Sequence, residues 1–110
     1  MDSKGISTII KERIAAGETN FEGEDLHGID LSGMHNLEDM NFRRCNLEGA
    51  IFRGCTLRGS DFRDTALAGV TFEETDLERC QFDGPELGKT NCRDAVMEGI
   101  VFTRGFFDPV

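Results

Sequence analysis

The sequence predicts an all-β solenoid, in which the chain coils around a ladder of its own large apolar side chains. The first observation behind this prediction is a period of five, which fits neither an α-helix nor a β-strand. The clearest run lies within residues 46–67 and consists of Leu47, Phe52, Leu57, Phe62 and Leu67. The second observation is that small residues, turn-forming residues and glycines recur in the same register. The third is that the aromatic residues are all Phe, without Tyr or Trp, which suits a dry interior.

The repeating unit is defined around its large apolar residue, here called the centre. The centres are Phe21, Leu26, Leu31, Leu37, Phe42, Leu47, Phe52, Leu57, Phe62, Leu67, Phe72, Leu77, Phe82, Leu87, Cys92, Met97, Phe102 and, if the register continues, Phe107. Small residues lie two positions before most centres, Asn or Asp often lies one before, and Gly often lies two after. One step, from Leu31 to Leu37, is six residues long. The extra residue predicts a local bulge around Met34 and His35.

This pattern determines which positions face inward. The centre and the small residue two before it are expected inside, and the other three positions face water. Asn and Asp favour turns because their side chains bond nearby backbone groups, and Gly relieves the corner sterically. Successive coils would then stack at about 4.8 Å and pair their backbone groups as strands do. Each coil buries its centres against its neighbours, so the stack should be cooperative.

Several units carry a family resemblance. The segments CNLEG, SDFRD and TDLER resemble the A(D/N)LXX motif of the pentapeptide-repeat family, and the resemblance covers about residues 19–104. It implies a right-handed quadrilateral β-helix with four units per coil. Every fourth centre would then stack, which gives Phe ladders on two facing walls and Leu ladders on the other two. One Phe ladder is Phe42, Phe62, Phe82 and Phe102, and the facing ladder is Phe52, Phe72 and Cys92.

The register divides the chain into a capping helix over residues 1–17, the pentapeptide-repeat β-helix over 18–105 and a tail over 106–110. In the first segment, Ser3 or Ser7 could begin the helix and Gly17 could end it. Its apolar face consists of Ile6, Ile9, Ile10 and Ile14. We expect this helix to cover the first coil, with a partner-binding helix as the alternative.

The C-terminal end has no such helix and stays apolar. Val96 and Val101 occupy outward positions, and Phe106 would do so as well. Because exposed apolar patches usually mark contacts, this end is predicted to self-associate, as a homodimer, through Val96, Val101, Phe106 and Phe107. The alternative is that the tail packs back over the last coil.

No catalytic or metal-binding pattern is visible in the sequence. The cysteines are Cys45, Cys55, Cys80 and Cys92; they form no CxxC pair and match no zinc spacing. They are expected to be buried free thiols in a reducing compartment. His27 and His35 are expected on the surface. The carboxylates face outward instead of pairing in a cleft, so no metal, cofactor or enzyme activity is predicted.

The charge balance restricts the class of partner. There are 21 acidic against 12 basic residues, for a formal net charge of -9. This balance argues against direct nucleic-acid binding and favours a basic partner. The sequence has no signal-peptide pattern and no apolar run near membrane-spanning length. A cytoplasmic protein of a bacterium or a phage-infected host cell, without membrane contact, is therefore expected.

Folded into four walls, the acidic residues form stripes along a rod. The predicted partner-binding carboxylates are Glu24, Asp25, Glu38, Asp39, Glu48, Glu73, Glu74, Asp76, Glu78, Glu86 and Glu98. Between the acidic segments lies a basic belt of Arg43, Arg44, Arg53, Arg58 and Arg63. The belt is either a second contact surface or a set of partners for neighbouring carboxylates.

The stripes lead to a hypothesis of DNA mimicry. A narrow rod with regularly spaced carboxylates could occupy the basic groove of a DNA-binding protein complex and inhibit it. The resemblance includes pentapeptide-repeat proteins that protect DNA gyrase from quinolones in this way, but this chain is shorter and lacks the dimerising helix and projecting loops that they commonly have. The first hypothesis is therefore a phage anti-CRISPR or other anti-defence inhibitor. The alternatives are a gyrase- or topoisomerase-binding protein of the quinolone-resistance type, and a general protein–protein interaction scaffold or effector.

Overall fold

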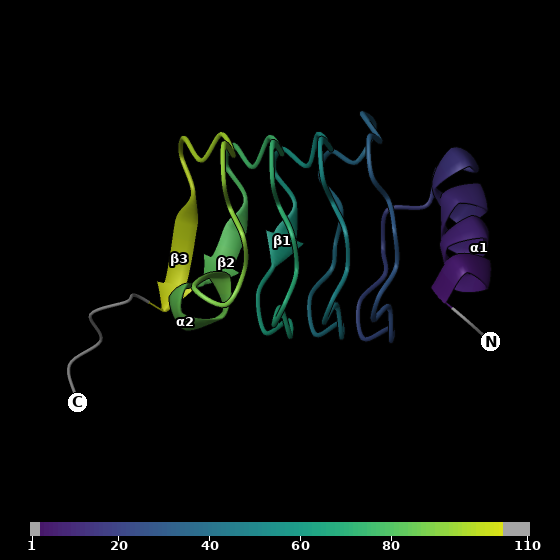
Figure 1. The fold of residues 1–110 in the computed structure, drawn as a ribbon, viewed down its shortest axis with the longest axis horizontal. Coiled ribbons are helices and arrows are strands. Elements are labelled where there is room, and N and C mark those ends of the chain that lie inside the picture. The colour runs from purple at the N-terminus through teal and green to yellow at the C-terminus, as the bar shows by residue number, and fades with distance from the viewer. Residues whose placement is uncertain (1–2, 105–110) are drawn as a thin grey trace.

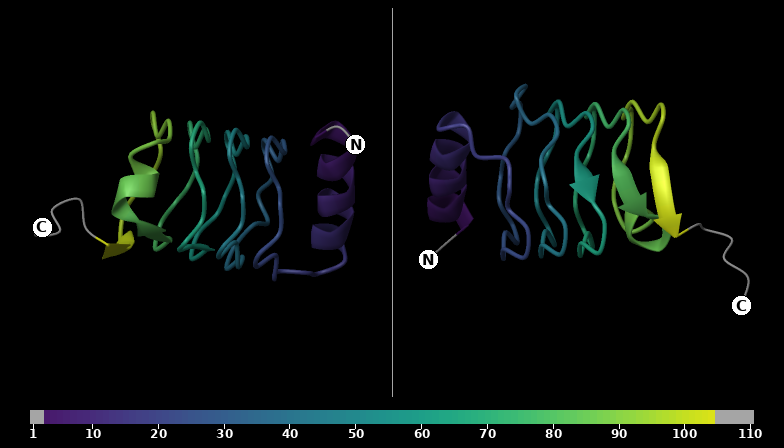
Figure 2. Two further views of the ribbon diagram at one scale, coloured as in Figure 1. Left: turned by 90° about the horizontal axis from the view of Figure 1, so that it is seen from below. Right: turned by 180° about the vertical axis from the view of Figure 1, so that it is seen from behind.

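The computed structural model describes residues 3–104, which form a stack of coils with a helix at one end (Figure 1). The elements in chain order are α1 (Ser3–Ala15), β1 (Asp61–Phe62), β2 (Gln81–Asp83), α2 (Gly84–Leu87) and β3 (Val101–Arg104). The stack is a rod with extents of 42 × 24 × 22 Å. In the views of Figures 1 and 2, the coils follow one another along the long axis from α1 to β3.

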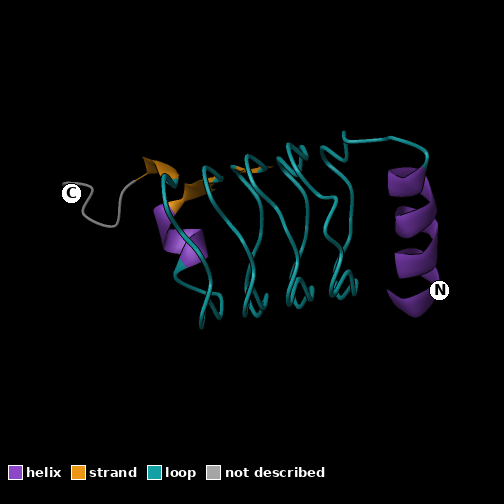
Figure 3. Ribbon diagram, turned by 90° about the horizontal axis from the view of Figure 1, so that it is seen from above, coloured by secondary structure: helices purple, strands orange, loops and turns teal. Residues whose placement is uncertain are grey.

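Each coil contains four units, because residues 20 positions apart pair in parallel. The three strands form one sheet in the order β1-β2-β3, with Phe62 beside Phe82 and Phe82 beside Phe102. Isolated parallel bridges repeat this spacing on other walls, for example between Thr56 and Asp76. Figure 3 shows that little of each coil is strand, since a wall of five residues soon ends in a turn. The chain thus forms the β-helix that the period of five predicts.

The six-residue step shifts this register at the predicted place. In the first coil the bridged residues are 21 positions apart instead of 20. The Leu31 N–H donates to the Ile51 carbonyl at 2.9 Å, whereas the Leu37 N–H donates to the Thr56 carbonyl at 3.2 Å. The spacing therefore shortens by one residue between Leu31 and Leu37, which confirms the predicted bulge.

Most corners of the coil use a left-handed backbone conformation two residues after the centre. Gly54 and Gly59 adopt it with φ of 68° and 73°, which glycine does without steric penalty. Among the described residues, the same position is also held by Asp39, Arg44, Asp64, Glu74, Arg79 and Asp94. Each of these non-glycine residues stores about 1–2 kcal/mol of steric strain, which the packing of the coils must offset.

The interior consists of stacked ladders, as predicted. One ladder stacks the rings of Phe21, Phe42, Phe62 and Phe82, with successive centroid separations of 5.8, 5.3 and 4.9 Å. On the facing wall, Phe52 and Phe72 stack at 5.5 Å. Edge-to-face contacts join the two ladders, such as the 5.5 Å contact between Phe62 and Phe72. All six rings are fully buried, so this aromatic column is the centre of the hydrophobic core.

The small residues before the centres fill the second inward position and also satisfy the backbone. The Cys45 thiol donates to the Phe21 carbonyl at 2.9 Å, and the Ser60 hydroxyl donates to the Leu37 carbonyl at 2.9 Å. Within the described residues all four cysteines are free: Cys45, Cys55 and Cys80 are buried, and Cys92 is half-buried. Burial raises the pKa of the Cys45 and Cys55 thiols to about 11 and that of Cys80 to about 12. These three thiols are therefore protonated at neutral pH.

The helix α1 covers the N-terminal end of the stack (Figures 1 and 2). Ile10 and Ile14 are buried in the core. Ile9 is 46% exposed, so the expectation that all four isoleucines face inward is wrong for this residue. The helix turns by about 100° per residue, which carries Ile9 away from the stripe that contacts the first coil. Gly17 follows the end of α1 with φ of 94°, as expected of a C-terminal glycine.

Polar contacts fix α1 on the first coil. Arg13 binds both carboxylate oxygens of Glu24, at 2.6 and 2.8 Å, and its guanidinium lies 4.5 Å from the centroid of the Phe21 ring. Ser7 lies inside the helix instead of at its start, and its buried hydroxyl accepts the Asp30 N–H at 2.9 Å. Ser7 thus anchors the cap instead of beginning the helix.

The repeat becomes irregular at α2, which replaces the corner expected after Phe82 (Figure 3). At most corners the N–H three residues after the centre donates to the centre's carbonyl, as Cys80 does to Leu77 at 3.1 Å. The equivalent residue after Phe82 is Pro85, which has no N–H. Pro85 instead lies in the first turn of a short helix, where proline is tolerated. The expectation of a regular unit here is therefore wrong, although Leu87 is still buried.

The C-terminal end of the described stack is open, in contrast to the N-terminal end. Val96 and Val101 are 46% and 52% exposed, as predicted for outward positions. The ladders predict Met97 and Phe102 inside, yet these side chains are 36% and 40% exposed because no described coil follows to cover them. The other two residues of the predicted self-association surface, Phe106 and Phe107, lie outside the described residues.

Candidate partner-binding surface

One wall of the rod carries five carboxylates against two cations, and we call it the acidic wall. It consists of the outward residues of the units centred on Leu37, Leu57, Leu77 and Met97. Its carboxylates are Glu38, Asp39, Asp76, Glu78 and Glu98, and its cations are Arg58 and Arg79. Parallel bridges join Thr56 to Asp76 and Asp76 to Val96, so these units lie directly above one another. Equivalent residues of successive coils are therefore about 4.8 Å apart along the rod.

The middle of the acidic wall is neutralised within the fold. Arg58 donates a hydrogen bond to Asp76, and this bond, with the charges of Asp76, Glu78 and Glu38, raises the pKa of Arg58. The Asp76 carboxylate also accepts the Glu78 N–H at 3.1 Å, and its side chain is only 18% exposed. Arg79 lies 3.8 Å from the Glu78 carboxylate. Asp76 and Glu78 are thus engaged by neighbours.

Three carboxylates at the two ends of this wall remain available. Glu38, Asp39 and Glu98 are exposed, and they form no ion pair with another residue in the range 3–104. Glu38 and Asp39 lie on the coil nearest the capped end, and Glu98 lies on the last described coil. A partner that spans the wall would meet negative charge at both ends.

The predicted basic belt is not a free cationic surface. Each of its arginines lies within 3.9 Å of a carboxylate; the pairs are Arg43 with Asp61, Arg44 with Glu22, Arg53 with Glu73 and Glu74, Arg58 with Asp76, and Arg63 with Asp61. Burial alone would raise the pKa of Asp61, but hydrogen bonds from Arg63 and the nearby charge of Arg43 outweigh it and hold that pKa below its ordinary value. Of the two alternatives for the belt, these contacts favour partners for neighbouring carboxylates.

Most of the other predicted carboxylates also have partners in the fold. Glu24 binds Arg13, Asp25 contacts His27 at 2.8 Å, Glu73 and Glu74 lie 3.7 Å from Arg53, and Glu86 binds Lys89 at 2.7 Å. Glu48 is exposed and has no ion pair with another described side chain. Cross-coil pairing therefore reduces the predicted stripes to a smaller set of available carboxylates.

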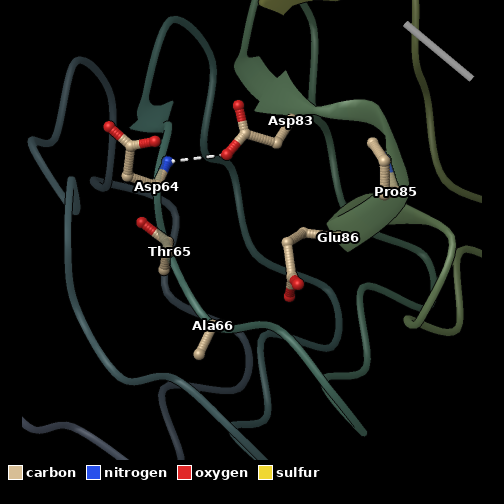
Figure 4. A pocket seen from close by; sticks show the side chains of 6 residues that line it. All are labelled: Asp64, Thr65, Ala66, Asp83, Pro85 and Glu86. Carbon is tan, nitrogen blue, oxygen red and sulfur yellow. Dashed lines mark hydrogen bonds between the residues drawn. The ribbon is translucent and has the colours of Figure 1, made fainter. Parts of the chain in front are cut away.

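A pocket of about 380 Å³ lies beside α2 (Figure 4). It is lined by Asp64, Thr65, Ala66, Asp83, Pro85 and Glu86. Here carboxylates accept N–H groups that elsewhere donate to backbone carbonyls: the Asp64 N–H donates to Asp83 at 3.0 Å and the Leu67 N–H donates to Glu86 at 3.1 Å. The buried Asp83 carboxylate also accepts the Thr103 hydroxyl at 2.6 Å. Asp83 and Glu86 thus repair the ladder beside α2, a role that the position of Pro85 could have signalled.

Within residues 3–104, no three His, Cys, Asp or Glu side chains are grouped so that they could hold a metal ion. His27 and His35 are exposed, as expected. Neither described helix has the length and apolar character needed to cross a membrane.

Comparison with known proteins addresses the repeat itself. A family profile described as pentapeptide repeats (9 copies) matches residues 37–107. This chain belongs to the pentapeptide-repeat family. Its membership agrees with the resemblance carried by the repeated units, and a protein–protein interaction scaffold is the coarse role that the family supports. Among curated proteins, none matches the chain.

Three solved structures of pentapeptide-repeat proteins are similar to this chain. One, from Nostoc Pcc 7120, is 19% identical over 89% of this chain and 95% of that chain, with a TM-score of 0.37. Rfr23 from the cyanobacterium Cyanothece 51142 is 15% identical over 92% and 99% of the two chains, with a TM-score of 0.25. One from the Arabidopsis thaliana thylakoid lumen is 16% identical over 78% and 63%, with a TM-score of 0.21.

Proposed function

We propose that this protein is a non-catalytic interaction rod that binds and inhibits a DNA-binding protein complex by presenting carboxylates in place of DNA phosphates. The family supports a protein–protein interaction scaffold, and DNA mimicry is a finer form of that role. The observation that carries the proposal is the acidic wall, on which Glu38, Asp39 and Glu98 are exposed without an ion pair to another described residue.

The right-handed winding of the coil, which the resemblance implies, stays a prediction.

The dimensions of the rod support a groove built for duplex DNA as the binding site. The cross-section of 24 × 22 Å is similar to the width of a DNA duplex. Equivalent side chains recur about every 4.8 Å along the wall, whereas duplex DNA carries one charge per about 1.7 Å of its axis. The wall is therefore a sparser array of charge than DNA. Binding should depend on salt, but less steeply than the binding of DNA by the same partner.

The proposed targets are complexes that hold duplex DNA in a basic groove in the cytoplasm of a bacterium or a phage-infected cell. A CRISPR or other anti-phage defence complex is the first candidate, and a topoisomerase such as DNA gyrase is the second. The proposal includes no direct contact with nucleic acid or membrane. Both targets would bind the same acidic wall. The affinities of the protein for each purified target, measured side by side, therefore decide between them.

A general interaction scaffold is the second candidate function. The observation that favours it is the extensive pairing of charge across coils, in which every arginine of the basic belt contacts a carboxylate. Walls of mixed and neutralised charge suit recognition by shape and hydrogen bonds. Such binding would change little with ionic strength, because neutral contacts are not screened by salt.

Two charge-reversal variants test the proposal. The wall variant Glu38→Lys/Glu98→Lys changes two available carboxylates of the acidic wall. The control variant Glu12→Lys/Glu18→Lys makes the same change in net charge at two exposed residues near the α1 end of the rod, neither of which is among the predicted partner-binding carboxylates. Affinities for a purified defence complex and for purified gyrase are measured at low and high salt, with and without duplex DNA.

The proposal expects the wall variant to bind at least about tenfold more weakly at about 0.1 M salt, because like charges then face the basic groove. The control should retain most of the affinity, and duplex DNA should displace the unmodified protein. Equal losses in both variants would show that net charge matters and the acidic wall does not. Binding that is indifferent to salt and to duplex DNA would favour the scaffold.

A further inference from the structure

We propose that Asp39 is the fixed anchor of the acidic wall, and that Gly59 on the next coil positions the Asp39 carboxylate for a basic side chain of the partner. This inference rests on the proposed function, because it concerns how the acidic wall recognises its partner. It selects one of the three available carboxylates, which belong to Glu38, Asp39 and Glu98. The selection follows from the way in which the fold holds the Asp39 side chain.

Asp39 and Gly59 occupy the same corner of successive coils. Each lies two residues after a centre, and each has a left-handed backbone, with φ of 56° at Asp39 and 73° at Gly59. The Asp39 N–H donates to the Arg58 carbonyl at 2.9 Å, which joins its corner to the residue before Gly59. The Gly59 N–H donates in turn to the Glu78 carbonyl of the following coil at 2.9 Å. The backbone ladder therefore holds the two corners one above the other.

The missing side chain at Gly59 leaves a notch that the Asp39 carboxylate fills. A Cβ built on Gly59 would overlap the Asp39 Oδ1 and would lie 3.4 Å from the Asp39 Cγ. Gly54, one unit earlier, provides the contrast. It has a similar backbone, with φ of 68°, yet a Cβ there would meet nothing within 4 Å apart from its chain neighbours. The contact at Gly59 is thus particular to Asp39 and does not follow from the corner alone.

A carboxylate in this notch presents its charge at a fixed place. The short Asp39 side chain is restricted by the contact of Oδ1 with Gly59, and no ion pair joins it to another residue in the range 3–104. Glu38 and Glu98 have longer, exposed side chains, whose ordering on binding costs free energy. Asp39 has less freedom to lose. Of the three available carboxylates, it is therefore the one that is preorganised for binding.

The orientation of the carboxylate also indicates the kind of contact that a partner makes. The Asp39 Oδ1 lies in the notch, whereas Oδ2 is more than 4 Å from the built Cβ position and points away from it. The outward Oδ2 can accept a charge-assisted hydrogen bond from one lysine or arginine of a basic groove. Such side chains contact phosphate oxygens when the groove holds DNA. Displacement of the carboxylate from the notch should therefore weaken binding, even though the charge stays on the chain.

The variant Gly59→Ala tests the positioning, and Gly54→Ala is its matched control. Both variants put alanine on a left-handed backbone, so both carry a similar backbone penalty. Only Gly59→Ala also forces the Asp39 carboxylate to move. NMR of the full chain, without a partner, records the carbon chemical shifts of the Asp39 side chain. Gly59→Ala should shift these signals and Gly54→Ala should leave them unchanged; equal shifts, or no shift in Gly59→Ala, would overturn the positioning role.

Affinity for the purified defence complex and for purified gyrase then tests the anchor. Asp39→Asn keeps the shape of the side chain and removes its charge, so it tests the anchor even if Gly59→Ala does not fold. Asp39→Asn and Gly59→Ala should each weaken binding at least about fivefold, and Gly54→Ala should stay within about twofold. In the double variant Asp39→Asn/Gly59→Ala, the second change should add less than about twofold, because the anchor is already lost.

Two outcomes would overturn the anchor role. Unchanged binding by Asp39→Asn would show that this carboxylate does not contact the partner. A further large loss in the double variant would show that the added methyl group itself obstructs the partner. If the native chain binds neither complex, the proposed function fails and the anchor role fails with it, whereas the NMR comparison still decides whether Gly59 positions Asp39.

Discussion

Replacement of Phe62 by alanine should lower the free energy of unfolding by about 4 kcal/mol, near the middle of the range for buried Phe-to-Ala changes. The Phe62 ring is fully buried and contacts four other rings: it stacks on Phe42 at 5.3 Å and on Phe82 at 4.9 Å, and it meets Phe52 and Phe72 edge to face. Removal of the ring leaves a cavity between coils that the neighbouring backbone, held by cross-coil hydrogen bonds, cannot easily close.

Phe102 provides a matched comparison on the same ladder. Its side chain is 40% exposed, so its removal loses about three fifths of the burial free energy and opens no enclosed cavity. Because full burial of a Phe side chain contributes about 1.5–3 kcal/mol, Phe102→Ala should lower the stability by only about 1–2 kcal/mol. Urea unfolding followed by circular dichroism measures both variants, with the free energy taken from the midpoint and slope. Equal losses in the two variants would refute the claim that stacking between covered coils stabilises the fold.

Three further predictions concern thiols, pH and corners. At pH 7.5, a thiol reagent should modify about one cysteine quickly in the native protein, the half-buried Cys92, and all four after denaturation; fast reaction of the buried thiols would contradict their burial. The pKa of Asp61 is lower in the folded than in the unfolded chain, so the stability from its carboxylate is present above the unfolded pKa and is lost as pH falls through the folded pKa. Urea midpoints of Asp61→Asn should therefore depend less on pH below about 4 than those of the native chain, and parallel curves would argue against this linkage. Arg44→Gly should raise the free energy of unfolding by a net of roughly 0.5 kcal/mol, and the thermal midpoint slightly with it, because relief of strain at φ of 59° exceeds the added entropy of the unfolded chain; a clear loss would show that the left-handed corner is not strained.

The sequence predicts the coil well because the fold depends on a local pattern. A centre such as Phe62 must face inward wherever the period of five holds, and a six-residue step can only bulge. The cross-coil ion pairs were less predictable, since Arg58 meets Asp76 through a 20-residue register and a particular side-chain conformation. The corner at Pro85 was missed because one absent N–H overrides an otherwise regular repeat. The exposure of Phe102 depends on whether another layer covers the last described coil, and the repeat pattern does not specify such a cover.

The acidic wall is best tested by competition with duplex DNA for one purified target, measured by displacement of a fluorescent duplex. We expect the native chain to displace the duplex and Glu38→Lys/Glu98→Lys to displace it at least about tenfold less effectively at equal concentration. The control Glu12→Lys/Glu18→Lys should compete nearly as well as the native chain. Simultaneous binding of the native chain and the duplex to the target, without displacement, would contradict DNA mimicry.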